Sequence, residues 1–310
     1  MNVERGNFEQ REVGAEKIIT REDLMTFEKY EEWGREYWKK EGEKFKPYEY
    51  EIIGESDKRL SYFGVEHSND PDNPMYGDEH KEGEIRNAFR DVRPQKVYVE
   101  GMHGLRGNKE EEVERIRAMS YEETIREYGE PGFTAKLAIE NNSDVESPEP
   151  DFRETIEYLL GQGFSKEEIF VHFFYLMVPE YQRMKKEDSD KNFRELIDRH
   201  IEEISLATKW EGFDYSYEHA VEIGKNIFLD RKFDPEDEFY QDRVGPFLSE
   251  SHKEEETVIN RISQEFNYFR DVYIVNQIRE ELEDTDRIFV VYGETHAVMQ
   301  RPALEKIIAK

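Results

Sequence analysis

Three short apolar runs constrain the fold of this chain more than any other feature. They cover residues 60–63, 96–99 and 287–292, and they are rich in β-branched and aromatic side chains. Runs of this length and composition are typical of buried strands. A weaker candidate lies at 137–139 and 144–145, where a helix end is followed by a short strand. Strands separated by helical stretches predict an α/β fold with a largely parallel or mixed central sheet flanked by helices.

Most of the remaining sequence has the charge pattern of helices. Thr20 and Asp23 have the spacing of a capping box, and we expect a long helix to follow them and to lie on the body of the protein. Residues 1–56 are therefore predicted to form an N-terminal helical extension. Other helices are expected at 151–160, 166–177, 192–207 and 254–282, and in a segment that opens at Asn108 and ends near 129–132.

The chain is strongly acidic. Its 310 residues include 73 Asp and Glu against 44 Lys and Arg, a formal net charge of −29. This balance argues against nucleic acid as a partner, because phosphate binding needs clustered cations. Aromatic residues make up 13% of the chain, a share that favours a folded protein over a disordered one. Dense carboxylates also lead to the hypothesis of a cell with high internal salt, where their repulsion is screened.

Cysteine is absent, and no window has the apolar length of a membrane span or the apolar core of a signal peptide. Without thiolates, any metal must be held by His and carboxylates. The expected address is the cytoplasm.

A short polar cluster follows each of the three clear strands. The clusters are Gly-Val-Glu-His at 64–67, Glu-Gly-Met-His at 100–103 and Gly-Glu-Thr-His at 293–296. Ligand sites of parallel α/β sheets form beyond the carboxyl ends of the strands. If the three strands are neighbours, His67, Glu100 and His296 meet in one cleft. Two imidazoles and one carboxylate can bind a divalent metal with positions left open for water or substrate.

The order of these motifs resembles that of the TraB/Tiki superfamily, whose wider relatives include ChaN-like and erythromycin-esterase-like proteins. The resemblance rests on the two G-x-x-H motifs, on the Glu-Gly pair at 100–101 and on Arg270 shortly before the last strand, and it covers most of residues 58–310. It implies an α/β core that carries its site at strand ends and has a helical insertion between its halves. Residues 57–310 are accordingly expected to form a single domain of this kind, with the insertion at about 151–250.

The superfamily's activities are diverse. Tiki proteins are metal-dependent peptidases, and erythromycin esterases open a macrolactone with His and Glu. ChaN binds haem, and TraB members are regulators. The resemblance therefore implies a site more strongly than it implies one reaction.

Four residues match the family's functional positions one by one. His67 and His296 match the two histidines, Glu100 the intervening glutamate and Arg270 the arginine. The family often has Arg-Asn at the last position, whereas this chain has Arg-Asp. The carboxylate of Asp271 is expected to pair with Arg270 or to add an acid to the site.

Four more residues are candidates for the same cleft. Glu294 can act as a general base or orient a neighbouring group, and Glu66 also precedes a motif histidine, although both can equally be solvated loop acids. Glu149 lies between two prolines and either reaches the cleft or forms a helix-entry turn. His103 either lines the cleft or sits in a simple turn. The histidines interpreted as structural or surface residues are His80, His172, His200, His219 and His252.

The leading hypothesis is a metal-dependent hydrolase of amide or ester bonds. His67, Glu100 and His296 would hold Mn, Co or Zn or transfer protons, and Arg270 would meet the negative charge that develops on a peptide or small-molecule substrate. The alternative is a binding or regulatory protein that holds haem, a peptide or another small ligand without chemistry. A third possibility is a scaffold in which the strand-end residues only satisfy loop backbone groups.

Overall fold

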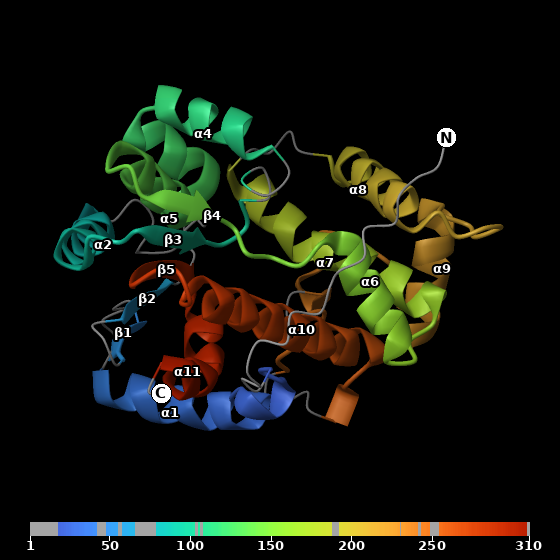
Figure 1. Cartoon of the computed structure of the whole chain (residues 1–310). Coiled ribbons are helices and arrows are strands. Elements are labelled where there is room, and N and C mark those ends of the chain that lie inside the picture. Colours follow the sequence, from blue (N-terminus) through green and yellow to red (C-terminus); the bar gives the residue numbers. More distant parts are fainter. Residues whose placement is uncertain are drawn as a thin grey trace, which may run out of the picture.

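The computed structural model describes residues 18–41, 48–54, 58–65, 79–102, 105, 108–187, 192–229, 231–240, 243–248 and 254–308. The strands are β1 (Tyr48–Ile53), β2 (Arg59–Val65), β3 (Lys96–Val99), β4 (Asp144–Glu146) and β5 (Arg287–Gly293). The helices are α1 (Phe27–Glu41), α2 (Glu79–Val92), α4 (Lys109–Ala118), α5 (Tyr121–Glu140), α6 (Phe152–Gly161), α7 (Lys166–Glu187), α8 (Phe193–Thr208), α9 (Tyr217–Ile227), α10 (Val258–Glu281) and α11 (Glu294–Ile308) (Figure 1).

The described strands form one sheet in the order β1-β2-β5-β3-β4. All neighbours are parallel except β1, which runs antiparallel to β2. The mixed, mostly parallel sheet flanked by helices confirms the predicted fold class. The last strand of the chain, β5, lies between β2 and β3, so the three predicted strands are neighbours and their carboxyl ends meet at one edge of the sheet.

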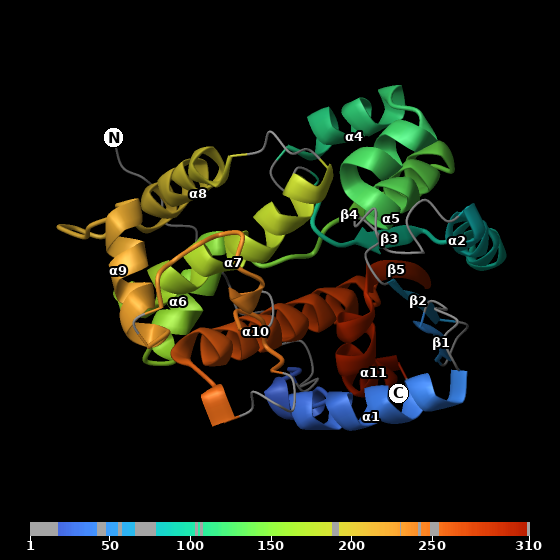
Figure 2. The ribbon, with the colours of Figure 1, turned by 180° about the vertical axis from the view of Figure 1, so that it is seen from behind.

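Side chains alternate between two cores along the central strands, as the two-residue period of a strand requires. Leu60, Tyr62, Ile288, Val290 and Tyr292 face the core that contains α10 and α11. Phe63, Val97, Val99, Phe289 and Val291 face the core that contains α2 and α5. Figures 1 and 2 show α4 and α5 on one side of the sheet and α11, covered by α1, on the other.

Helices α6 to α9 form a third core beside the sheet, within the range expected for the helical insertion. Aromatic rings fill it, among them Phe170, Phe174, Tyr175 and Tyr240. Helix α10 is 24 residues long and runs from this helical part to the sheet (Figure 1). It therefore belongs to both parts of the molecule. Within the described ranges, no helix combines the length and the apolar composition needed to cross a bilayer.

The N-terminal region differs from the prediction in two ways. Thr20 and Asp23 form a capping box, but it caps the N-terminus of a 3-10 turn at Arg21–Asp23. Helix α1 begins separately at Phe27. Strand β1 was not predicted, and it places residues 48–53 in the sheet and not in a helical extension. Its sequence alternates buried tyrosines with exposed glutamates, as in an edge strand with one solvated face. The boundary at 56/57 thus separates two paired strands.

The range of α5 consists of two helical segments that meet at Gly129, within the segment at 129–132 where the sequence predicts a helix end. Gly129 has a φ of 64°, which breaks the helical geometry at that residue. Pro131 follows in the first turn after the break, where a missing backbone N–H costs little. Gly129 therefore ends the first helical segment, and Pro131 stands at the start of the second.

Candidate active site

Four segments that are distant in the sequence meet at the carboxyl edge of the sheet. Glu100 follows β3 directly, and Glu149 lies three residues beyond β4. Strand β5 runs straight into α11, so His296 lies in the first turn of that helix. Helix α10 passes the same edge and contributes Arg270 and Asp271. The sheet topology therefore brings together five of the predicted site residues.

Arg270 is the centre of this cluster. Its Nε and Nη2 donate to the two carboxylate oxygens of Glu149, both at 2.7 Å. Nη2 also donates to Oε1 of Glu100 at 3.2 Å. Burial disfavours both charges, but the pairing outweighs it: the pKa of Arg270 is raised and the pKa of Glu149 is lowered by their mutual attraction. Glu149 is only 4% exposed, so this is a buried, bidentate ion pair.

His296 is held from both sides of its ring. Nδ1 lies 2.6 Å from Oδ1 of Asp271, and Nε2 lies 3.3 Å from Nη1 of Arg270. A guanidinium can only donate, so Nε2 is the acceptor and the proton of the neutral ring is on Nδ1, facing Asp271. Burial and the charge of Arg270 lower the pKa of His296, but the charge and hydrogen bond of Asp271, together with the charge of Glu100, outweigh them and raise it above the ordinary value. The side chain of Asp271 is fully buried.

Glu100 connects the strand ends. Its Oε2 accepts from the backbone N–H of Gly293 at 2.6 Å, at the start of α11. Its Oε1 faces Arg270 and lies 3.6 Å from Nε2 of His296. The positive end of the α11 dipole and the guanidinium both attract this carboxylate. Glu100 is therefore positioned with one oxygen fixed and the other facing the imidazole.

The remaining predicted residues are placed as follows. Glu66, His67 and His103 lie outside the described residues. Strand β2 ends at Val65, which pairs with Gly293, so the chain leaves the described range at the edge of the sheet that carries the site. Glu294 is partly buried and begins α11. The carboxylate of Asp271 contacts His296 and Gln300, which is the arrangement of the second alternative.

Two residues of the cluster were not predicted. Gln300 donates to Oδ1 of Asp271 at 2.7 Å and accepts from the Tyr62 hydroxyl at 3.0 Å, which orients the acid that holds His296. Its spacing of four from His296 on one helix was the available signal. Tyr292 is fully buried in β5, and burial together with the carboxylates of Glu149 and Glu100 raises its pKa well above the ordinary value. Nothing in an apolar strand distinguishes this tyrosine from a core residue.

The glycine of the first G-x-x-H motif has a packing role. A Cβ at Gly64 would lie 2.7 Å from Cβ of Ala297, closer than real Cβ atoms approach. The absence of a side chain at Gly64 therefore lets β2 pass close to α11, the helix that carries His296.

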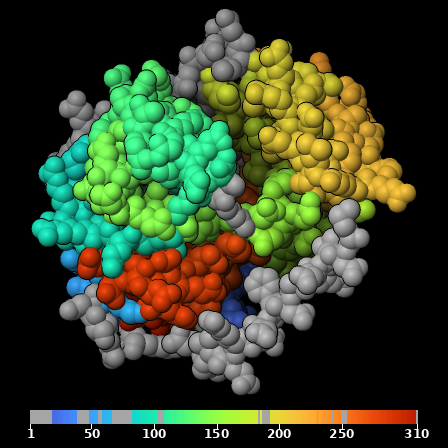
Figure 3. Space-filling model, turned by 45° about the horizontal axis from the view of Figure 1, so that its top comes forward, coloured from blue at the N-terminus to red at the C-terminus, as the bar shows by residue number. Residues whose placement is uncertain are grey.

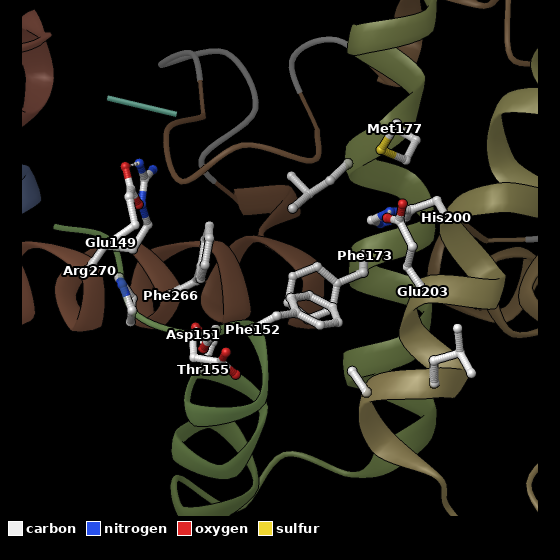
Figure 4. Close-up of a pocket in the computed structure, with 14 residues that line it drawn as sticks. Glu149, Asp151, Phe152, Thr155, Phe173, Met177, His200, Glu203, Phe266 and Arg270 are labelled. Carbon is white, nitrogen blue, oxygen red and sulfur yellow. Dashed lines mark hydrogen bonds and ion pairs between the residues drawn. The ribbon is translucent and has the colours of Figure 1, made fainter. Parts of the chain in front are cut away.

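A pocket of about 950 Å³ opens beside the cluster and extends into the helical part. Arg270 and Glu149 line one end, the rings of Phe152, Phe173 and Phe266 line its middle, and the other end lies on α8 (Figure 4). Figure 3 shows that this face of the molecule is hollowed between the α4–α5 pair and α8. The volume is within the range of small-molecule sites.

The described residues fit the expected metal site only in part. His296 and Glu100 lie together, and His67 lies outside the described range. No group of three His, Asp or Glu side chains in the described ranges is arranged to hold a metal ion. The carboxylates of Glu149 and Glu100 already share a cation, the guanidinium of Arg270. A metal would have to take the place of Arg270 at Nε2 of His296, the ring nitrogen that carries the lone pair.

Comparisons with family models, with curated proteins and with solved structures give no significant match to this chain. The resemblance to the TraB/Tiki superfamily stays a prediction.

Proposed function

We propose that this protein hydrolyses ester or amide bonds, with His296 as the base that activates water. One observation carries the proposal: the Asp271 carboxylate fixes the Nδ1 proton of His296, so that the lone pair of Nε2 faces Glu100 and Arg270. An imidazole oriented by a buried acid is the arrangement that general-base catalysis requires.

Hydrolysis would then proceed as an ordinary addition and elimination. A water would first replace Arg270 as the hydrogen-bond donor to Nε2 of His296. Nε2 then takes a proton from this water, and the water oxygen attacks the carbonyl carbon of the substrate. The electron pair moves to the carbonyl oxygen, whose negative charge faces the guanidinium of Arg270. When the intermediate collapses, His296 returns the proton to the departing alcohol or amine.

The acids around Arg270 have supporting roles in this scheme. Glu149 binds the guanidinium through two parallel hydrogen bonds, which hold the plane of Arg270 in one orientation. Glu100 is held by the Gly293 N–H and raises the pKa of His296 further, so that the imidazole is a stronger base. Both are positioning residues for Arg270 and His296.

The metal-dependent version uses the same residues. His296, Glu100 and His67 would hold the ion, which would supply Lewis acidity and a more acidic water when bound. Assays before and after dialysis against a chelator, with Mn, Co or Zn added back, separate the two versions. Activity that survives chelation supports the metal-independent scheme.

The proposal is tested by turnover of nitrophenyl esters and nitroanilides of aromatic acids. We expect His296→Ala to lower kcat/KM by about 10²- to 10⁴-fold, the usual contribution of a general base. The matched control is His219→Gln, which replaces a partly buried histidine of α9 far along the chain from the site residues. Turnover that is equal in both variants, or absent from the parent protein across both substrate classes, would overturn the proposal.

The pocket keeps a second candidate function open, the binding of a small ligand without chemistry. In that case a ligand bound by the parent protein would be recovered unchanged after long incubation. Haem belongs to this candidate, and a Soret band lost in His296→Ala would support it.

A further inference from the structure

The pocket beside Arg270 has an aromatic lining that continues to the charged cluster. The rings of Phe152 and Phe173 meet edge to face with centroids 4.8 Å apart, and Phe173 meets Phe266 in the same way at 6.1 Å. The guanidinium carbon of Arg270 lies 5.6 Å from the centre of the Phe266 ring. An apolar group in the pocket would therefore contact aromatic faces along a path that ends at the proposed reaction centre.

The charges that line the pocket are mostly negative. Glu149 is neutralised by Arg270, and Asp151 accepts from the backbone N–H of Arg153 at 2.7 Å as the N-cap of α6. Glu203 differs from both, because its ion-pair partner is His200, at 3.5 Å.

The charge of Glu203 remains available to a ligand. Burial lowers the pKa of His200, so the ring is neutral near pH 7 and does not compensate the carboxylate. The side chain of Glu203 is 73% exposed, so a ligand can reach it. Figure 4 shows Glu203 and His200 across the aromatic rings from Arg270 and Glu149.

We propose that this pocket binds the apolar, aromatic body of the substrate and that Glu203 selects substrates that carry a basic amine. The inference rests on the proposed function only in placing the scissile bond at Arg270. Aromatic groups are favoured because three phenylalanines line the pocket. Anionic groups are disfavoured because three acids, Glu149, Asp151 and Glu203, line the described part of the pocket together with Arg270.

The test compares three probes with the same apolar body and different charges: phenylbutylamine, phenylbutanol and phenylbutyrate. Isothermal titration calorimetry should show that the amine binds most tightly and the carboxylate most weakly. Each step should be about 1.5- to 5-fold, the size expected of one exposed charge interaction. Equal affinities for the amine and the carboxylate, or no binding of the amine, would overturn the proposal.

Two matched pairs of variants locate the effect. Glu203→Gln should remove the preference for the amine over the alcohol, whereas Glu202→Gln, on the same helix outside the pocket lining, should keep it. Leu206→Asn should weaken all three probes, because Leu206 lines the pocket, and Leu229→Asn should not, because Leu229 is 91% exposed outside it. Equal effects within either pair would contradict the assignment.

The probes contain no hydrolysable bond, so the result is independent of turnover. A protein that binds the amine as expected but hydrolyses no ester or amide would retain the pocket assignment and lose the proposed function. A protein that hydrolyses esters but binds the three probes without preference for charge would retain the proposed function and lose the pocket assignment.

Discussion

The molecule buries a histidine in each of its two parts, and their surroundings are opposite. His296, at the sheet edge, is 7% exposed and contacts Asp271, Arg270 and Glu100. His172, in α7 of the helical part, is fully buried, and neither of its ring nitrogens has a hydrogen-bond partner among the described residues. Its ring lies against Phe173 and Phe266.

The same degree of burial thus has opposite consequences for the imidazole. Burial lowers the pKa of His172 to about 3. At His296 the carboxylates outweigh burial and raise the pKa. Nearby charges, more than burial, distinguish a histidine prepared for proton transfer from one that fills a core.

The largest expected effect on stability comes from opening the buried ion pair at the sheet edge. Glu149→Ala leaves Arg270 without its bidentate partner, and we expect a loss of about 3–5 kcal/mol in the free energy of unfolding. The matched control is Asp198→Ala, which removes an exposed partner of Arg194 on α8 and should cost about 0.3–0.5 kcal/mol. Urea titrations measure both. Similar losses in the two variants would show that the cluster does not behave as a buried pair.

The second prediction concerns stability in acid. Because the pKa of His172 is lowered in the folded state, only the unfolded chain binds this proton between pH 6.5 and about 3. This group makes stability fall with decreasing pH by about 1.4 kcal/mol per pH unit. His172→Phe removes the group, so relative to the parent protein the variant should gain about 2 kcal/mol between pH 6.5 and pH 5. The same difference in free energy of unfolding between the variant and the parent protein at pH 6.5 and pH 5 would contradict the lowered pKa of His172.

The third prediction concerns His296, whose pKa is shifted upward, in the direction opposite to that of His172. A raised folded-state pKa contributes stability that is complete below the unfolded value and is lost as pH rises through the folded value. NMR titration of histidine-labelled protein should show His296 titrating above the ordinary value of about 6.5. In Asp271→Asn its midpoint should move to lower pH, because the neighbouring negative charge is gone. An unchanged midpoint would mean that Asp271 does not control this imidazole.

The strands of the sheet differ in how well the sequence predicts them. The strands that carry the site are continuous apolar runs, so their pattern and the polar residues after them were recognisable. Strand β1 was not predicted because glutamates alternate with its buried tyrosines, so that this edge strand contains no continuous apolar run. The pairing of β5 between β2 and β3 was not readable from local pattern, since it depends on packing across the whole chain.

The site was predicted in part for the same reason. Glu100 and His296 follow strands and were found by position, whereas the link from Asp271 to Gln300 depends on how α10 crosses α11. His172, interpreted as a structural or surface residue, is fully buried, and its sequence neighbours do not indicate that both ring nitrogens lack hydrogen-bond partners among the described residues. The two prolines beside Glu149 indicated a fixed loop, but this signal did not decide between the cleft and a helix-entry turn.

The smallest expected effect is the influence of salt on the stability that each ion pair contributes, the buried Arg270–Glu149 pair and the exposed Arg194–Asp198 pair. In molar potassium chloride the Debye length is about 3 Å, so the contribution of the exposed Arg194–Asp198 pair should vanish. The cost of Glu149→Ala should stay nearly the same, because buried pairs are screened much less. The parent protein, with a net charge of −29, should unfold at a higher midpoint in this salt than in dilute buffer, because repulsion among its carboxylates is screened. If the unfolding midpoint of the parent protein is the same in molar salt and in dilute buffer, the hypothesis of salt adaptation is lost. If the cost of Glu149→Ala also falls with salt, the Arg270 cluster is in contact with solvent.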